Sequence, residues 1–151
     1  MPARPTLRRL EKLLDGFRHV RLLVVGDVVL DEYLWGDVDR VSPEAPVPVV
    51  HVRRESQLLG GAGNVVRNVV ALGAGCEFCA AIGEDRAGDR VLELLAALAV
   101  DTAGLVRVPG RPTTRKTRVV ARSQQVVRYD RETTAPLPAP AARALLAAVE
   151  A

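Results

Sequence analysis

The chain has 151 residues and a mass of 16.2 kDa, which is enough for one ordinary domain. Hydrophobic residues make up 48% and charged residues 26%, a globular balance that excludes a wholly disordered chain. No apolar run approaches the roughly 18 residues of a membrane span, and the charged N-terminus lacks the apolar segment of a secretory signal. We therefore expect a cytoplasmic protein with no membrane contact. The net charge is +3, yet nine basic and three acidic residues between 107 and 151 favour an anionic partner.

The N-terminal third predicts a helix, a strand and an extended excursion. Residues 7–17 place leucines and a phenylalanine on one helical stripe, which indicates an amphipathic helix. Residues 20–25 are a continuous apolar run closed by glycine, which predicts a strand buried on both faces of a parallel sheet. Residues 36–54 contain three prolines, which exclude a central strand or a helix interior and favour an extended, edge-like excursion.

The middle of the chain alternates helices and strands. A glycine cluster at residues 60–63 opens a helical pattern that Gly73 stops, and residues 76–82 predict a second buried strand. Asp85 is placed to cap the following helix, and residues 105–108 are a candidate third strand. This alternation predicts an α/β fold with a parallel sheet.

The C-terminal third predicts a hairpin, a proline-rich linker and a helix. Residues 113–121 and 125–129 are β-prone runs on either side of a short polar turn. Residues 141–151 begin a helix that lacks a capping glycine or a closing segment, so we expect the chain to be a fragment of a longer domain.

Two acidic side chains follow the first predicted strand. Asp27 and Asp31 lie at its carboxyl end, where open α/β sheets bind their ligands, and a carboxylate there can accept hydrogen bonds from sugar hydroxyls. The alternative is that both carboxylates only cap turns.

The glycine cluster offers two interpretations as well. Gly60, Gly61 and Asn64 stand at the start of a helix, where free N–H groups and bare backbone can meet a ligand. The same glycines also permit tight packing of the helix on the sheet. No Gly-Lys-Ser/Thr follows, which excludes a Walker A loop.

The two cysteines do not predict a metal site. Cys76 and Cys79 fall in one strand, where the alternation of side chains directs them to opposite faces. A zinc site needs about four ligands, and the chain has only two histidines, so we interpret both cysteines as packing residues and expect no metal.

The predicted hairpin is strongly basic. Residues 107–131 hold seven arginines, one lysine and a single acid, and Lys116, Arg118 and Arg122 fall on one strand face. Arginine matches phosphate in a bidentate manner, which favours a small phosphate ligand. A second interpretation, a basic face that contacts only solvent, stays open. Binding of nucleic acid is disfavoured because only one aromatic residue accompanies these charges.

Taken together, these motifs resemble the ribokinase/PfkB carbohydrate kinases. The resemblance rests on the Gly-Asp segment at 26–31, the string Ser-Pro-Glu-Ala-Pro-Val-Pro at 42–48, the glycine cluster, and residues 114–130. Within this family the chain is most similar to the N-terminal half of the heptose 7-phosphate kinases, which are often fused to a heptose 1-phosphate adenylyltransferase. The resemblance covers the chain from residue 20 onward.

The resemblance implies a ribokinase-like fold: the N-terminal part of a mostly parallel sheet flanked by helices, with a small β-lid. Residues 1–151 would form the N-terminal half of the kinase domain, with lid segments at about 36–54 and 113–131. The lid would close over the sugar and pair two protomers. Asp31, with Asp27 beside it, would bind sugar hydroxyls, and Gly60, Gly61 and Asn64 would line the sugar site. The phosphate at position 7 would be held by basic residues of the second lid segment: Lys116, Arg118, Arg122 and Arg128.

The resemblance also implies what this half lacks. The second family signature, a Gly-Ala-Gly-Asp motif that carries the catalytic base, is not present in these residues. We therefore assign no catalytic residue, and expect most of the site for ATP and Mg²⁺ to lie in the missing half. The implied activity is ATP-dependent phosphorylation of heptose 7-phosphate at its anomeric hydroxyl, toward ADP-heptose for lipopolysaccharide.

Three alternatives stay open beside this activity. The first is another sugar or nucleoside kinase of the family, and the second is a non-catalytic remnant that binds sugar phosphate or dimerises. The third is a basic nucleic-acid-binding module.

Overall fold

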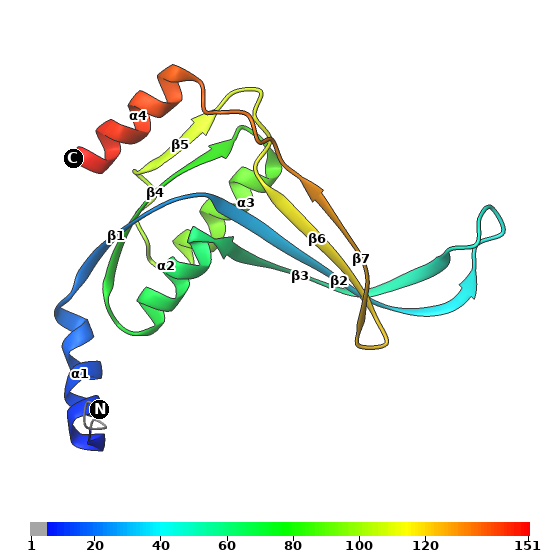
Figure 1. Cartoon of the computed structure of the whole chain (residues 1–151), viewed down its shortest axis with the longest axis horizontal. Helices are drawn as coiled ribbons and strands as arrows, with labels where there is room; N and C mark the ends of the chain where they lie inside the picture. Colours follow the sequence, from blue (N-terminus) through cyan, green and yellow to red (C-terminus); the bar gives the residue numbers. More distant parts are fainter. Residues whose placement is uncertain (1–5) are drawn as a thin grey trace, which may run out of the picture.

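The computed structural model describes residues 6–151, which form two sheets and their flanking helices (Figure 1). In chain order the elements are α1 (Leu7–Gly16), the short 3₁₀ helix η1 (Phe17–His19), β1 (Arg21–Val25), β2 (Val28–Val41), β3 (Pro48–Gly61), α2 (Ala62–Ala71), β4 (Gly75–Gly83), α3 (Arg86–Ala96), β5 (Leu105–Val108), β6 (Arg115–Ala121), β7 (Gln124–Arg131) and α4 (Ala139–Glu150).

The first sheet is parallel and has three strands in the order β1-β4-β5. Helices α2 and α3 pack on one face, and α4 lies across β4 and β5 on the other (Figure 1). Parallel strands joined by helices that cover both faces define an α/β fold, as the alternating pattern predicts. The strand predicted at residues 105–108 is confirmed as β5.

The core lies between this sheet and the helices α2 and α3. Phe78 and Ile82 of β4 contribute its centre, and each is only 1% exposed. Val66 of α2 and Val91 and Leu95 of α3 pack against them and are fully buried. These residues recur at a spacing of two on the strand and of three to four on the helices, so each element turns one apolar face inward.

The prediction that the first strand is buried on both faces is wrong. Val24 packs against the core, but Leu23 and Val25 point to the opposite face and are 44% and 51% exposed. The reason is that β1 is an edge strand, and α4 covers β4 and β5 but does not extend over β1.

The two cysteines of β4 point to opposite faces, as the alternation predicts. Cys76 packs against the α2 side, whereas the thiol of Cys79 faces α4 and lies 3.6 Å from the carbonyl oxygen of Ala148. Burial, with the charge of Glu77, raises the pKa of both thiols, so they remain protonated packing groups.

The second sheet has four strands in the order β3-β2-β6-β7 and extends away from the first (Figure 1). β2 pairs with β3 in antiparallel register and with β6 in parallel register, and β6 and β7 form the predicted hairpin. The proline-rich stretch joins two long strands, and β3 begins at Pro48 and lies at the sheet edge, where a missing N–H is tolerated. The strands begin earlier than the predicted excursion, because the apolar residues from Val28 onward already belong to β2.

The amphipathic N-terminal helix is present as α1, and it ends one residue earlier than predicted. The leucines of its predicted stripe cover no core: Leu7, Leu10 and Leu14 are 73%, 42% and 54% exposed. Among residues 6–151, no helix combines the length and the apolar character that a membrane crossing requires.

Candidate functional site

The candidate site begins where the two sheets join. The chain passes from β1 to β2 through Gly26 and Asp27, and from β3 to α2 through Gly60 and Gly61. The two crossings touch, because Ala62 N–H donates to the carbonyl oxygen of Asp27 at 2.9 Å. Gly61 has φ +56°, and a Cβ there would lie 2.5 Å from that same oxygen, so only glycine fits this crossing.

Asp31 is the central carboxylate of the site. It lies on β2, directly beside Gly60, where any Cβ would overlap its Oδ2 atom. Its Oδ1 accepts a hydrogen bond of 2.5 Å from Nη1 of Arg118 on β6. Both side chains are only about one-fifth exposed, so the charges are held in a partly desolvated pair. The hydrogen bond that Arg118 donates to Asp31 raises the pKa of Arg118 despite its burial, which keeps the guanidinium charged.

The strand register gathers charges around this pair. Asp31 stands opposite Lys116 of β6, which stands opposite Asp130 of β7. One row further along the same face, Arg118 stands opposite Arg128, and Arg128 donates to Asp130 at 3.0 Å. This face therefore carries three cations, Lys116, Arg118 and Arg128, on the two strands that follow β2 in the sheet.

An aromatic ladder continues the same face of β2. The rings of Tyr33 and Trp35 stack with centroids 5.7 Å apart. The guanidinium of Arg118 lies 5.2 Å from the Tyr33 centroid, and that of Arg54 lies 4.8 Å from the Trp35 centroid. The sequence reasoning missed this ladder, although the alternation Asp31, Tyr33, Trp35 along one strand is a signal that reveals it.

The remaining predicted residues are more dispersed. Asn64 is exposed in the first turn of α2, and the side chain of Asp27 is exposed beside it. Arg122 does not share a strand face with Lys116 and Arg118, because it lies in the turn after β6 with φ +48°. It donates to the carbonyl oxygen of Val38, seven residues and therefore about 23 Å along β2 from Asp31.

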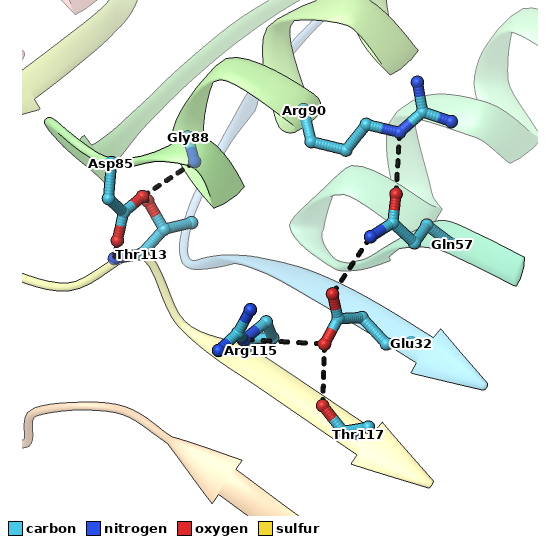
Figure 2. Close-up of polar contacts among 8 residues, drawn as sticks. All are labelled: Glu32, Gln57, Asp85, Gly88, Arg90, Thr113, Arg115 and Thr117. Atoms are coloured by element: carbon cyan, nitrogen blue, oxygen red, sulfur yellow. Dashed lines mark hydrogen bonds and ion pairs between the residues drawn. The ribbon is translucent and has the colours of Figure 1, made fainter. Parts of the chain in front are cut away.

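The opposite face of the four-stranded sheet carries a polar chain to helix α3 (Figure 2). Arg90 of α3 donates to Gln57 of β3 at 2.9 Å, and Gln57 donates to Glu32 of β2 at 3.0 Å. Glu32 also accepts from Thr117 at 2.7 Å, and Arg115 Nε lies 3.4 Å from it. Glu32 follows Asp31 in the sequence, so these hydrogen bonds help to fix the position of β2 relative to helix α3.

A second polar cluster fixes the entry to β6 (Figure 2). Asp85 caps α3, as predicted, by accepting from Gly88 N–H at 2.8 Å. The same carboxylate accepts from the hydroxyl and the N–H of Thr113 at 2.7 and 3.0 Å. Burial raises the pKa of Asp85, but these hydrogen bonds and the charge of Arg115 outweigh burial and lower it.

The described residues do not form a site for a metal ion. Within residues 6–151, no three His, Cys, Asp or Glu side chains come together in a way that can hold one. The cluster around Asp31 combines a carboxylate, which accepts from hydroxyl groups, with guanidinium and ammonium groups, which bind anions.

Comparisons with known proteins identify the family of the chain. Residues 21–151 match the pfkB family carbohydrate kinases, and the chain belongs to this family. Its fold is ribokinase-like: a ribokinase from Cryptococcus neoformans is 27% identical with a TM-score of 0.52 over 76% of this chain and 34% of the other. A putative ribokinase from Agrobacterium tumefaciens, 24% identical, superposes with a TM-score of 0.58 over 74% of this chain and 36% of the other.

Relatives found by sequence are more similar to this chain than these solved structures are. The bifunctional protein HldE of Trichlorobacter lovleyi is 52% identical over 86% of this chain and 26% of its own length. The protein of the same name from Desulfatibacillum aliphaticivorans is 54% identical over 77% of this chain and 24% of its own length. The chain thus spans about a quarter of the length of these curated relatives.

Proposed function

We propose that this chain is the sugar-binding part of an ATP-dependent kinase that phosphorylates heptose 7-phosphate at its anomeric hydroxyl, in the cytoplasm. The observation that carries the proposal is the pair of Asp31 and Arg118, which places a hydroxyl acceptor next to a phosphate-binding guanidinium. The proposal is supported by the match to the pfkB family carbohydrate kinases and by the bifunctional HldE relatives, which are about half identical to this chain.

Each residue of the site has a distinct role in this proposal. Asp31 accepts hydrogen bonds from sugar hydroxyls, and Gly60 leaves room for that carboxylate, because a Cβ there would overlap its Oδ2 atom. Gly61, Asp27 and Asn64 line the junction at the start of α2. Lys116, Arg118 and Arg128 hold the phosphate, since their positive charges lie on the same face as Asp31. Arg122 takes no part in this site, because it lies in the distant turn.

ATP and Mg²⁺ are the cofactors of the proposed kinase. ATP supplies the phosphoryl group, and Mg²⁺ neutralises the charge that develops during transfer. The ribokinase from Cryptococcus neoformans was solved in complex with ADP, which supports a nucleotide cofactor. None of the described residues forms a cluster suited to Mg²⁺, so we assign no residue of this chain to the metal and no catalytic base.

The four-stranded sheet is proposed as the lid over the sugar. It carries Asp31 and Arg118 on one face and is joined to the parallel sheet by short crossings that contain glycine. Its outer strands β3 and β7 have free edges, and Val127 and Tyr129 of β7 are 48% and 51% exposed. Such edges favour pairing with a second protomer, and the exposed face of β1 favours association with the remaining half of a kinase domain.

Equilibrium binding tests the proposed function directly. Titration of the 151-residue chain with a heptose 7-phosphate, followed by calorimetry, should give saturable binding that Asp31→Asn weakens at least about tenfold. Asp37→Asn is the matched control, because Asp37 lies on the same strand but pairs with Arg53 at 3.1 Å, away from the site. ATP turnover by the chain alone, or equal binding by both variants, would contradict the assigned roles.

A further inference from the structure

The carboxylate of Asp31 is already engaged within the protein. Its Oδ1 accepts from Arg118 Nη1, and its Oδ2 lies against the backbone at Gly60. A sugar hydroxyl that takes the place of Arg118 on Oδ1 therefore displaces a charge-assisted hydrogen bond in a partly desolvated setting. Among the described residues Arg118 forms its ion pair with Asp31, whereas the nearby Asp130 pairs with Arg128.

A phosphate group has what is needed to draw Arg118 away from Asp31. It carries a larger negative charge than one carboxylate, and its oxygens match the planar fork of arginine. It would also be attracted by Lys116 and Arg128, which stand beside Asp31 and Arg118 in the register. The planar guanidinium stacks over Tyr33, a contact that lets it turn toward an incoming anion while it remains on the ring.

We propose that Arg118 makes sugar binding conditional on phosphate: the phosphate of the ligand takes the guanidinium, and only then is Oδ1 of Asp31 released for a sugar hydroxyl. This inference rests on the proposed function and adds a specificity-determining role for Arg118. A sugar without phosphate that takes the place of Arg118 on Oδ1 breaks the ion pair without compensation, whereas a sugar phosphate replaces it. Arg118 therefore disfavours binding of a sugar without phosphate and also favours binding of a sugar phosphate.

The test compares D-mannose 6-phosphate with D-mannose as probes on the full chain and on Arg118→Gln. The variant should bind the sugar phosphate at least about tenfold more weakly. It should bind unphosphorylated mannose about fivefold more tightly, because Asp31 no longer has a charged internal partner. Weaker binding of the sugar phosphate together with tighter binding of mannose is expected only if Arg118 both holds phosphate and occupies Asp31.

Two outcomes overturn the inference. If the variant loses the sugar phosphate while mannose binds no more tightly, Arg118 only holds phosphate. If both ligands weaken together, its role is structural. Arg53→Gln is the control, since it removes a similar arginine–aspartate pair on β2 and β3 outside the site, and it should alter neither affinity.

A second measurement needs no variant. Inorganic phosphate added to the unmodified chain should raise its affinity for mannose, because phosphate alone can engage Arg118 and release Asp31. Unchanged or weaker mannose binding would refute the inference even if Arg118→Gln did not fold. If the unmodified chain binds no sugar phosphate, the proposed function itself fails. If it binds in an Asp31-dependent way and the tests above fail, only the role of Arg118 is lost.

Discussion

Asp85→Asn tests whether a single carboxylate joins helix α3 to the start of β6. In the native chain, Oδ1 accepts from Gly88 N–H and the Thr113 hydroxyl, and Oδ2 accepts from Thr113 N–H. Asparagine keeps one acceptor oxygen, but its amide nitrogen then faces the N–H of Thr113. Both groups are hydrogen-bond donors, so the N–H of Thr113 loses its acceptor. Thr113 is 3% exposed, so water cannot replace the lost partner.

The expected loss follows from these contacts. An unsatisfied buried N–H destabilises by about 1–3 kcal/mol, and replacing charge-assisted hydrogen bonds by neutral ones adds roughly 0.5–1 kcal/mol. We expect a total near 2–3 kcal/mol at neutral pH, which lowers the melting temperature by roughly 5–10 °C in a chain of this size. Chemical denaturation followed by circular dichroism measures this difference.

The pH dependence supplies the decisive check. The pKa of Asp85 is lowered in the folded chain, so the charged form stabilises it fully above the unfolded value of about 3.9. That stability is lost as pH falls through the folded pKa, and the two proteins should converge at acid pH. Asp89→Asn, in the same turn but exposed and paired with Arg107, is the control and should change stability by less than about 1 kcal/mol. A difference that does not change with pH would refute this account of Asp85.

Three further predictions follow from the packing. Gly61→Ala should destabilise the fold by at least about 1–3 kcal/mol, since φ is +56° and the new Cβ would meet a carbonyl oxygen. Gly16→Ala is the control: nothing lies within 4 Å of its new Cβ, so it should not destabilise the fold. Thermal melts compare the two variants. Leu95→Ala removes a fully buried side chain and should lower the free energy of unfolding by about 2–5 kcal/mol. Leu146 is 61% exposed, so Leu146→Ala should lower it by less than about 0.5 kcal/mol. Equal losses of stability in denaturant titrations would contradict the assigned core. Gln57→Leu breaks the polar chain from α3 to β2 and should speed amide hydrogen exchange in β2 and β3 by up to about tenfold, while exchange in the core strand β4 stays unchanged.

Local patterns in the sequence were sufficient for most of the elements. The alternation of apolar runs and glycines predicted the parallel strands and α2, and a polar residue before Arg86 predicted the cap of α3. The β-prone runs around residues 122–124 predicted the hairpin of β6 and β7. These features depend on side chains close in sequence, whose spacing decides which face of an element is apolar. The family, too, was recognisable from the motifs at 26–31 and 42–48, and the match over residues 21–151 confirms it.

The site itself depended on contacts that no local pattern contains. Asp31 and Arg118 are 87 residues apart in sequence, and only the parallel pairing of β2 with β6 brings them together. The same pairing excludes Arg122, which a strand pattern alone had grouped with Arg118.

Burial likewise was decided by the tertiary structure. The apolar sequence of β1 is suited to a strand buried on both faces, yet its edge position and the limited reach of α4 leave Leu23 and Val25 exposed. Sequence composition determines which side chains are able to form a core, whereas the order of strands and the placement of helices determine which of them are covered. The residues of this chain thus define its elements and its family, and long-range strand pairing defines the cluster that we propose binds the sugar phosphate.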